Sequence, residues 1–137
     1  MANAKKVFDI AVHMMDEQSE NTGSTTTEDT LEYKFRTLSI LNAVLQSVFP
    51  YSKNYIPGDA YPQLEEYKDE KSLLQEIPLE ESLATGVMPY ALAAHLLAGE
   101  NEELSAWFLN RYNNAFSEIR NRTPAEFKPI ATPYGLF

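Results

Sequence analysis

The 137-residue chain contains no cysteine. This absence excludes disulfide bonds, thiol nucleophiles and cysteine-ligated zinc or iron–sulfur centres, and it is compatible with a reducing compartment. Positive charge is also scarce, because 11 lysines and arginines are outnumbered by 20 acidic residues, which gives a net charge of −9. General nucleic-acid binders present a basic face, and an acidic surface repels phosphate. The composition therefore argues against such a binder, and the length is typical of one domain.

The chain also lacks an apolar run suited to a membrane span or a secretory signal. Its most apolar stretch, residues 79–98, begins with turns that carry Glu80 and Glu81, so the purely apolar part is too short to cross a bilayer. Near the N-terminus, Asp9 and Asp16 interrupt the positions where a signal peptide has its apolar core. We therefore expect no membrane partner and no secretory signal.

No motif of a catalytic or cofactor site is present, such as HExxH, GxSxG or a glycine-rich phosphate loop. Asp9, His13 and Asp16 have a spacing that metal sites use, but an ordinary polar helix face explains them better. His95 lies in the apolar stretch, and we interpret it as a hydrogen-bonded core residue. We expect no enzyme activity, no catalytic, cofactor-binding or metal-binding residues, and no cofactor.

Helical periodicity predicts four main helices. The first covers residues 4–16, and the second runs from about residue 28 to residue 49, where Pro50 ends it. The third, residues 79–98, is apolar nearly all round and should be the buried central helix. The fourth covers residues 102–122. The fold class is therefore all-α, a bundle of four main helices, with a flexible polar loop at residues 17–27.

Several single residues carry specific expectations. Gly86 and Pro89 interrupt the third helix, where they favour a bend around neighbouring helices over a switching role. Gly99 suits a left-handed C-terminal cap, and Asn101 suits the N-cap of the fourth helix. Asn42 lies in the apolar stripe predicted for the second helix. The stripe is composed of Leu31, Phe35, Leu38, Asn42, Leu45 and Phe49, and its face is widened by Leu41, Val44 and Val48. If it is buried, Asn42 needs a structural hydrogen bond.

A long loop, residues 50–78, separates the second and third helices. It holds half of the chain's eight prolines and half of its eight tyrosines. Tyrosine buries area at low entropic cost and keeps a polar tip, so it is favoured at interfaces. The candidate interface residues here are Tyr51, Tyr55, Tyr61 and Tyr67. The loop either packs on its own bundle or contacts a partner, and residues 65–74 could include a short helical turn.

The predicted domain division places the bundle in residues 1–122 and an extended C-terminal arm in residues 123–137. Its three prolines argue against a continued helix, yet the arm is rich in large apolar side chains. The candidate interface residues in it are Phe127, Ile130, Tyr134, Leu136 and Phe137. The arm either folds back on the bundle or docks on a neighbouring molecule.

Charge is distributed unevenly along the sequence. Residues 65–81 contain seven acidic residues and two lysines, whereas residues 111–128 contain four basic and two acidic residues. A solvated surface explains both segments, and contact between opposite charges on different subunits is the alternative.

The segment from Val87 to Tyr112 carries several short motifs in a fixed order. They are Pro89-Tyr90, Leu92-Ala93-Ala94, Glu100-Asn101, Phe108 and Arg111-Tyr112. Residues 33–52 contain a second series, with Tyr-Lys, Arg-Thr and Pro-Tyr-Ser in succession. Over most of residues 5–120 the pattern resembles head–tail connector proteins (adaptor or head-completion proteins) of tailed bacteriophages and prophages of Gram-positive bacteria.

The resemblance implies a mostly helical structural protein of the virion neck, made in the cytoplasm of the bacterial host. Such adaptors bind under the portal protein as a ring, typically of about twelve copies. They extend the channel through which DNA passes without specific binding, and they dock a stopper or another neck or tail protein. Each subunit of a head-to-tail ring needs two different contact patches.

Two other functions remain open from the residues. A stopper or tail-completion protein of the same neck region would be predominantly β, which the helical pattern does not favour. A small helical regulatory or ligand-binding domain would be a stable monomer with an internal pocket.

Overall fold

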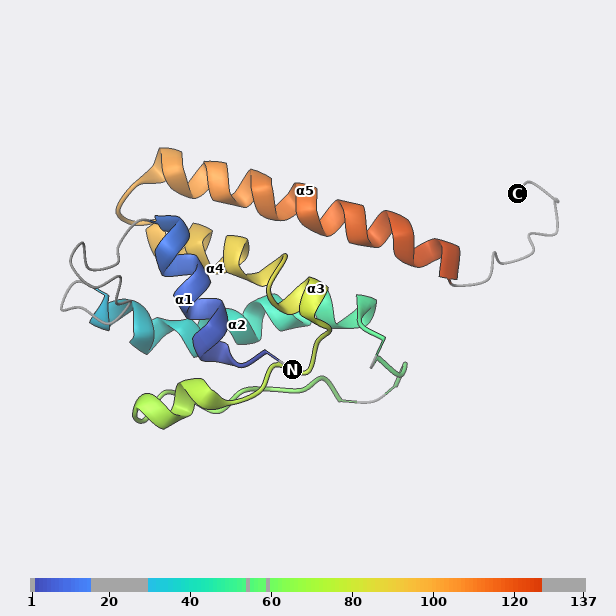
Figure 1. Ribbon diagram of the computed structural model, residues 1–137, viewed down its shortest axis with the longest axis horizontal. Coiled ribbons are helices and arrows are strands. Elements are labelled where there is room, and N and C mark those ends of the chain that lie inside the picture. Colours follow the sequence, from blue (N-terminus) through green and yellow to red (C-terminus); the bar gives the residue numbers. More distant parts are fainter. Residues whose placement is uncertain (1, 16–29, 54, 59, 127–137) are drawn as a thin grey trace, which may run out of the picture.

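The structure, a computed structural model, describes residues 2–15, 30–53, 55–58 and 60–126, with side chains of the last helix described as far as residue 121. Within these residues the chain forms five α-helices and two 3₁₀ helices and no strand (Figure 1). They are α1 (Ala4–Met15), α2 (Leu31–Val48), η1 (Phe49–Tyr51), η2 (Glu70–Leu74), α3 (Glu81–Ala84), α4 (Met88–Leu97) and α5 (Glu102–Glu126). Since α3 is a single turn, the all-α bundle of four main helices is confirmed. The loop predicted at residues 17–27 lies outside the described residues.

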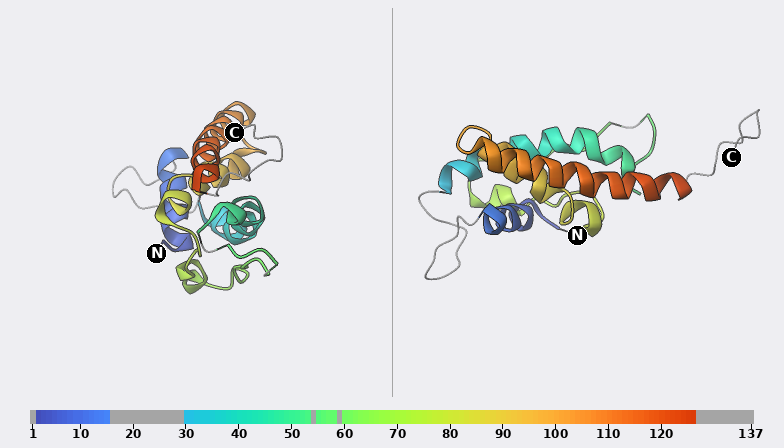
Figure 2. Two further views of the ribbon diagram at one scale, coloured as in Figure 1. Left: turned by 90° about the vertical axis from the view of Figure 1, so that its right-hand side faces the viewer. Right: turned by 90° about the horizontal axis from the view of Figure 1, so that it is seen from above.

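The short helix α4 occupies the centre of the bundle. All its residues except Tyr90 and His95 are buried, and α1, α2 and α5 pack around it (Figures 1 and 2). Three buried alanines, Ala91, Ala93 and Ala94, leave room for the neighbouring helices to approach closely. None of the described helices combines the length and the apolar character that crossing a bilayer requires. The predicted central helix is thus confirmed in its buried position.

Its predicted length was wrong, because residues 79–98 form two helices instead of one bent helix. The break falls between α3 and α4, at Gly86 and Val87. A Cβ atom on Gly86 would lie 2.5 Å from the backbone oxygen of Ser82, so the chain approaches itself closely there. Pro89 lies in the first turn of α4, where a missing backbone N–H costs nothing and the fixed φ suits a helix start.

The turn between α4 and α5 confirms one predicted cap and contradicts the other. The Asn101 side-chain oxygen accepts a hydrogen bond from the Leu104 amide at 3.0 Å, which caps α5. Gly99 does not have the left-handed conformation; among the described glycines it is Gly58, in a loop turn, that has a positive φ, of 95°. The Glu100 and Asn101 amides both donate to the Leu97 oxygen, so the turn closes without a left-handed residue.

Helix α2 buries its predicted face from Leu38 onward, but its first two turns bury different residues from the predicted ones. Leu31 and Phe35, expected in the core, are 43% and 53% exposed. Lys34 and Thr37 are buried in their place, in line with the buried leucines further along the helix. Thr37 lies four residues before Leu41 and Lys34 three residues before Thr37, so both lie on the buried face of the helix. The prediction failed here because the bulky apolar residues are at positions 31 and 35 instead.

Polar side chains of α2 hold the long connection between α2 and α3 on the bundle. The Asn42 amide group donates to the Leu64 oxygen at 2.9 Å, and its oxygen accepts from the Leu64 amide at 2.7 Å. The hydrogen bond expected of Asn42 is therefore confirmed. The Lys34 ammonium donates to both Glu70 carboxylate oxygens at 2.9 Å, and η2 is the short helical turn predicted in this region.

Backbone hydrogen bonds join the N-terminal residues before α1 to the end of the connection between α2 and α3. The Ala4 amide donates to the Gln75 oxygen and the Ile77 amide to the Ala2 oxygen, each at 2.9 Å. These bonds surround an isolated antiparallel bridge between Asn3 and Glu76.

The last helix, α5, extends along the bundle, and its C-terminal end reaches beyond the other helices (Figure 1). It ends at Glu126, four residues later than predicted, so the boundary placed between residues 122 and 123 lies inside a helix. A proline near a helix end removes one hydrogen bond and keeps a helical φ, so Pro124 does not stop the helix. The rest of the predicted arm, residues 127–137, lies outside the described residues.

We predict that Gly86→Ala lowers the free energy of unfolding by about 1–3 kcal/mol, because the new Cβ meets a backbone oxygen and the turn has to shift. Gly99→Ala is the matched control: no atom lies within 4 Å of the added Cβ, and φ is not positive. This change should leave stability unchanged or raise it slightly. Urea unfolding measures both, and equal effects would contradict the prediction.

We also predict an asymmetric response at the Lys34–Glu70 pair, because the Lys34 side chain is 2% exposed and that of Glu70 is 59% exposed. Glu70→Ala takes a carboxylate from a buried ammonium and should cost about 1–3 kcal/mol. Lys34→Met keeps the packing of the side chain and leaves Glu70 in water, so it should cost less than about 1 kcal/mol. Thermal unfolding of both, with Glu66→Ala as a control for lost surface charge, tests the order.

Candidate protein-interaction surfaces

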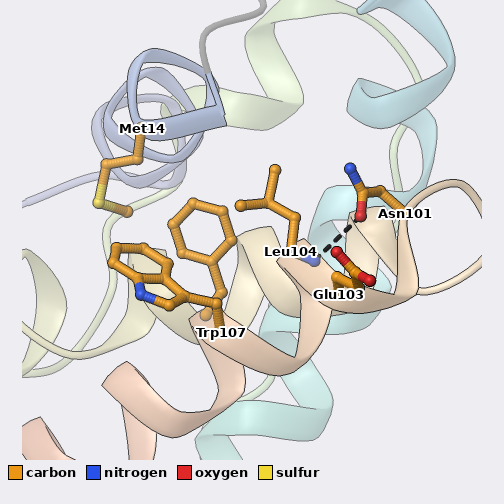
Figure 3. A pocket seen from close by; sticks show the side chains of 6 residues that line it. Met14, Asn101, Glu103, Leu104 and Trp107 are labelled. Carbon is orange, nitrogen blue, oxygen red and sulfur yellow. Dashed lines mark hydrogen bonds between the residues drawn. The ribbon is translucent and has the colours of Figure 1, made fainter.

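A groove of about 480 Å³ lies where the end of α1 meets the start of α5. The Asn101 cap fixes the first turn of α5, which directs Leu104 and Phe108 inward. Trp107 lies beside them and is 52% exposed. Figure 3 shows these side chains around one hollow, with Met14 of α1 on the opposite wall. The groove is thus apolar inside and lined by side chains of α1, of α5 and of the turn before α5.

Trp107 is partly exposed because its neighbour takes the inward position. Consecutive residues on a helix point about 100° apart, so Trp107 and Phe108 cannot both face the core. Their rings make an edge-to-face contact with 5.0 Å between centroids. The Arg111 guanidinium lies 5.7 Å from the centroid of the indole and 5.6 Å from that of Tyr90, which fixes the indole from the next turn of α5.

The edge of the groove is acidic. Glu103 lines it from the first turn of α5, where a carboxylate is also favoured by the helix dipole. The neighbouring Glu102 is exposed and is not among the lining residues. A fitting ligand would insert an apolar side chain against Trp107 and Met14 and place a positive charge near Glu103.

The four loop tyrosines predicted as interface residues are all half-buried and pack against the core. Tyr55 and Tyr61 contact each other and also the Phe49 ring, with centroids 5.6–6.1 Å apart. Tyr51 makes an edge-to-face contact with Phe116 of α5 at 5.2 Å. The structure therefore supports the interpretation of a loop packed on its own bundle, and Tyr51, Tyr55 and Tyr61 gather near one end of it.

Tyr67 lies apart from the other three, against the exposed start of α2. Its ring contacts Phe35 edge-to-face at 5.1 Å, and Leu31 lies one turn before Phe35 on the same side of the helix. Leu31 and Phe35 thus form an exposed apolar patch that sequence reasoning placed in the core.

Burial raises the pKa of three tyrosines in these surfaces. Desolvation is the main cause for Tyr61, with a further contribution from Tyr55. For Tyr67, desolvation is followed by the nearby Glu70 and Asp69 carboxylates. Desolvation also raises the pKa of Tyr112, and the Arg120 guanidinium partly opposes it.

The acidic segment is partly used inside the chain. Glu70 pairs with Lys34, and Glu80 accepts hydrogen bonds from the Ser52 hydroxyl at 2.6 Å and the Lys53 amide at 2.8 Å. Glu81 lies 3.6 Å from the Lys6 ammonium. These contacts reduce the negative charge available for an outside partner.

The sequence analysis interpreted His95 as a core residue and Asp9, His13 and Asp16 as an ordinary polar helix face. His95 is exposed, so its interpretation as a core residue was wrong; it lies on the narrow strip of α4 that neighbouring helices leave uncovered. Asp9 pairs with Lys5 at 2.9 Å, and Asp16 lies outside the described residues. No group of three potential metal ligands occurs within the part of the chain that the structure describes.

The five candidate residues of the arm, Phe127, Ile130, Tyr134, Leu136 and Phe137, lie outside the described residues. Sequence reasoning did not predict the groove. The signal that was available is the adjacent Trp-Phe pair, which requires one of the two rings to face outward.

Comparisons with known family models, with curated proteins and with solved structures gave no match for this chain.

We predict that the free energy of unfolding falls as the pH rises above about 10, the ordinary tyrosine pKa. Because the pKa of Tyr112 is raised in the folded protein, the unfolded chain loses this proton first, so stability present at lower pH is lost in that range. Tyr112→Phe should weaken this pH dependence. Urea titrations of both proteins at pH 8 and near pH 11 measure the free energy of unfolding at each pH. An equal loss of stability between the two pH values in both proteins would contradict the role assigned to Tyr112.

Proposed function

We propose that the chain is a head–tail connector adaptor of a tailed bacteriophage, located in the virion neck after synthesis in the host cytoplasm. One observation carries the proposal. The segment that resembles these proteins, residues 87–112, forms α4, the capped turn and the first part of α5. The resemblance therefore lies on the helical hairpin that organises the bundle.

The distribution of surfaces suits a ring of neighbouring copies under the portal. A head-to-tail ring needs two different patches on each subunit. The groove lies at the N-terminal end of α5, whereas Tyr51 of η1 contacts Phe116 further along this helix. The end of α5 reaches beyond the bundle and is available for a contact outside it (Figure 2).

The charge of the chain suits a channel through which DNA passes. Phosphate contacts give most of the non-specific affinity for DNA, and a protein with a net charge of −9 offers few of them. In this proposal the partners are the portal protein, neighbouring copies and a stopper or another neck or tail protein.

A second candidate is a small helical ligand-binding domain, which the groove favours. Its volume of about 480 Å³ falls within the range of small-molecule sites, about 300–1,000 Å³. In this case the protein would remain a monomer and would not bind a portal. A stopper or tail-completion protein has less support, since the described residues contain no strand.

The decisive experiment measures the mass of the full chain by light scattering, alone and mixed with the portal encoded in the same genome. We predict a protein that joins the portal as a ring of copies visible by electron microscopy. The same protein mixed with an unrelated phage portal is the control. A chain that stays separate from its own portal would rule out the adaptor function and leave the ligand-binding domain.

A further inference from the structure

We propose that residues 127–137 of one copy dock into the groove between α1 and α5 of a second copy. This inference rests on the proposed function, because it names the contact between neighbours in the ring. Its test does not require the portal, so the two can fail separately.

The chemistry of the segment matches that of the groove. The segment holds Phe127, Ile130, Tyr134, Leu136 and Phe137, and its two prolines favour an extended polyproline conformation. Extended proline-containing segments characteristically dock on grooves lined by aromatic rings, since they lose little entropy on binding. Here the half-exposed indole of Trp107 and the Met14 thioether provide such a surface.

The charges of the segment and of the groove indicate the direction in which the segment docks. Lys128 is the single charged side chain of residues 127–137, and among the described residues that line the groove Glu103 is the one that carries a charge. A lysine at one end of the docked segment can therefore pair with the acidic edge. Such an exposed pair contributes modestly to affinity but fixes the direction of the segment.

The reach of the segment favours a second copy over its own groove. Trp107 and Glu126 are nineteen residues apart on α5, so about 28 Å of helix separates them. The eleven residues that follow span about 34 Å in a polyproline conformation. To reach the groove of its own chain, the segment would have to run back along about 28 Å of α5. About 6 Å of its length would remain, so only about its last two residues would enter the groove. Both prolines and Lys128 would remain outside.

Docking on a second copy has a consequence for assembly. The segment and the groove are different surfaces, so the contact is heterologous and repeats from copy to copy. Such a contact closes into a ring when the rotation between copies permits.

Trp107 is the chain's only tryptophan and reports directly on the groove. We would titrate the full chain with a synthetic peptide of residues 127–137, which contains tyrosine but no tryptophan, and follow selectively excited tryptophan emission. A saturable blue shift is expected as the indole leaves water. Emission that does not respond to the peptide would overturn the proposal, even for a chain that joins the portal.

Glu103→Lys should weaken peptide binding about fivefold, and a peptide with Lys128→Glu should restore it. Glu102→Lys is the matched control: it makes the same charge change in the same helical turn, outside the groove, and should leave the affinity unchanged. Equal weakening by both variants would show a general charge effect and contradict the assigned contact.

Disulfide formation distinguishes the two copies, because the chain has no cysteine of its own. A Glu103→Cys chain is mixed with a Lys128→Cys chain of different mass under oxidation, because the proposed pairing brings these two positions together. In the control, a Gln46→Cys chain, changed at an exposed position of α2, takes the place of the Glu103→Cys chain. Rapid heterodimer formation by the first pair alone supports docking between copies. A further chain carries both changes. If it forms a disulfide within itself and no dimers, the segment binds its own groove and the proposal is overturned.

Discussion

The burial of α4 is the interaction on which the rest of this structure depends. Eight of its ten residues are removed from water, and each of the other long helices packs on it. A helix of this length has little stability of its own, so its neighbours and not its propensity keep it folded. Because α4 fills the centre, α5 needs only one face for the core. Its other side is free to carry Trp107 and the arginines.

The connection between α2 and α3 follows a different physical rule. It has little regular secondary structure, so its backbone groups need partners from elsewhere when they approach the core. Asn42 supplies a donor and an acceptor to one residue, as a neighbouring strand would. The Lys34 ammonium, placed at the surface of the core by a buried stem, anchors η2. Polar side chains thus replace secondary structure along this connection.

Much of the fold could be predicted from periodicity, capping and burial, whereas the candidate site could not. The four helices, the Asn101 cap and the Asn42 hydrogen bond depend on local signals. The burial of Lys34 and the exposure of His95 depend on which strip of each helix its neighbours cover, which is a tertiary property. The groove is formed by residues of α1 and α5, which are far apart in the sequence. No local pattern could indicate that Met14 and Trp107 line the same hollow.

The order of elements along the chain has a consequence for folding during synthesis. α1 and α2 emerge from the ribosome before α4, yet α4 is the helix that covers their apolar faces. The backbone partner of Ala4, Gln75, also emerges late. Until α4 has been synthesised, the nascent chain therefore carries uncovered apolar helices, which exposes it to chaperones and to aggregation. The core closes only when α4 becomes available, so α1 and α2 depend on a helix that follows them in the chain.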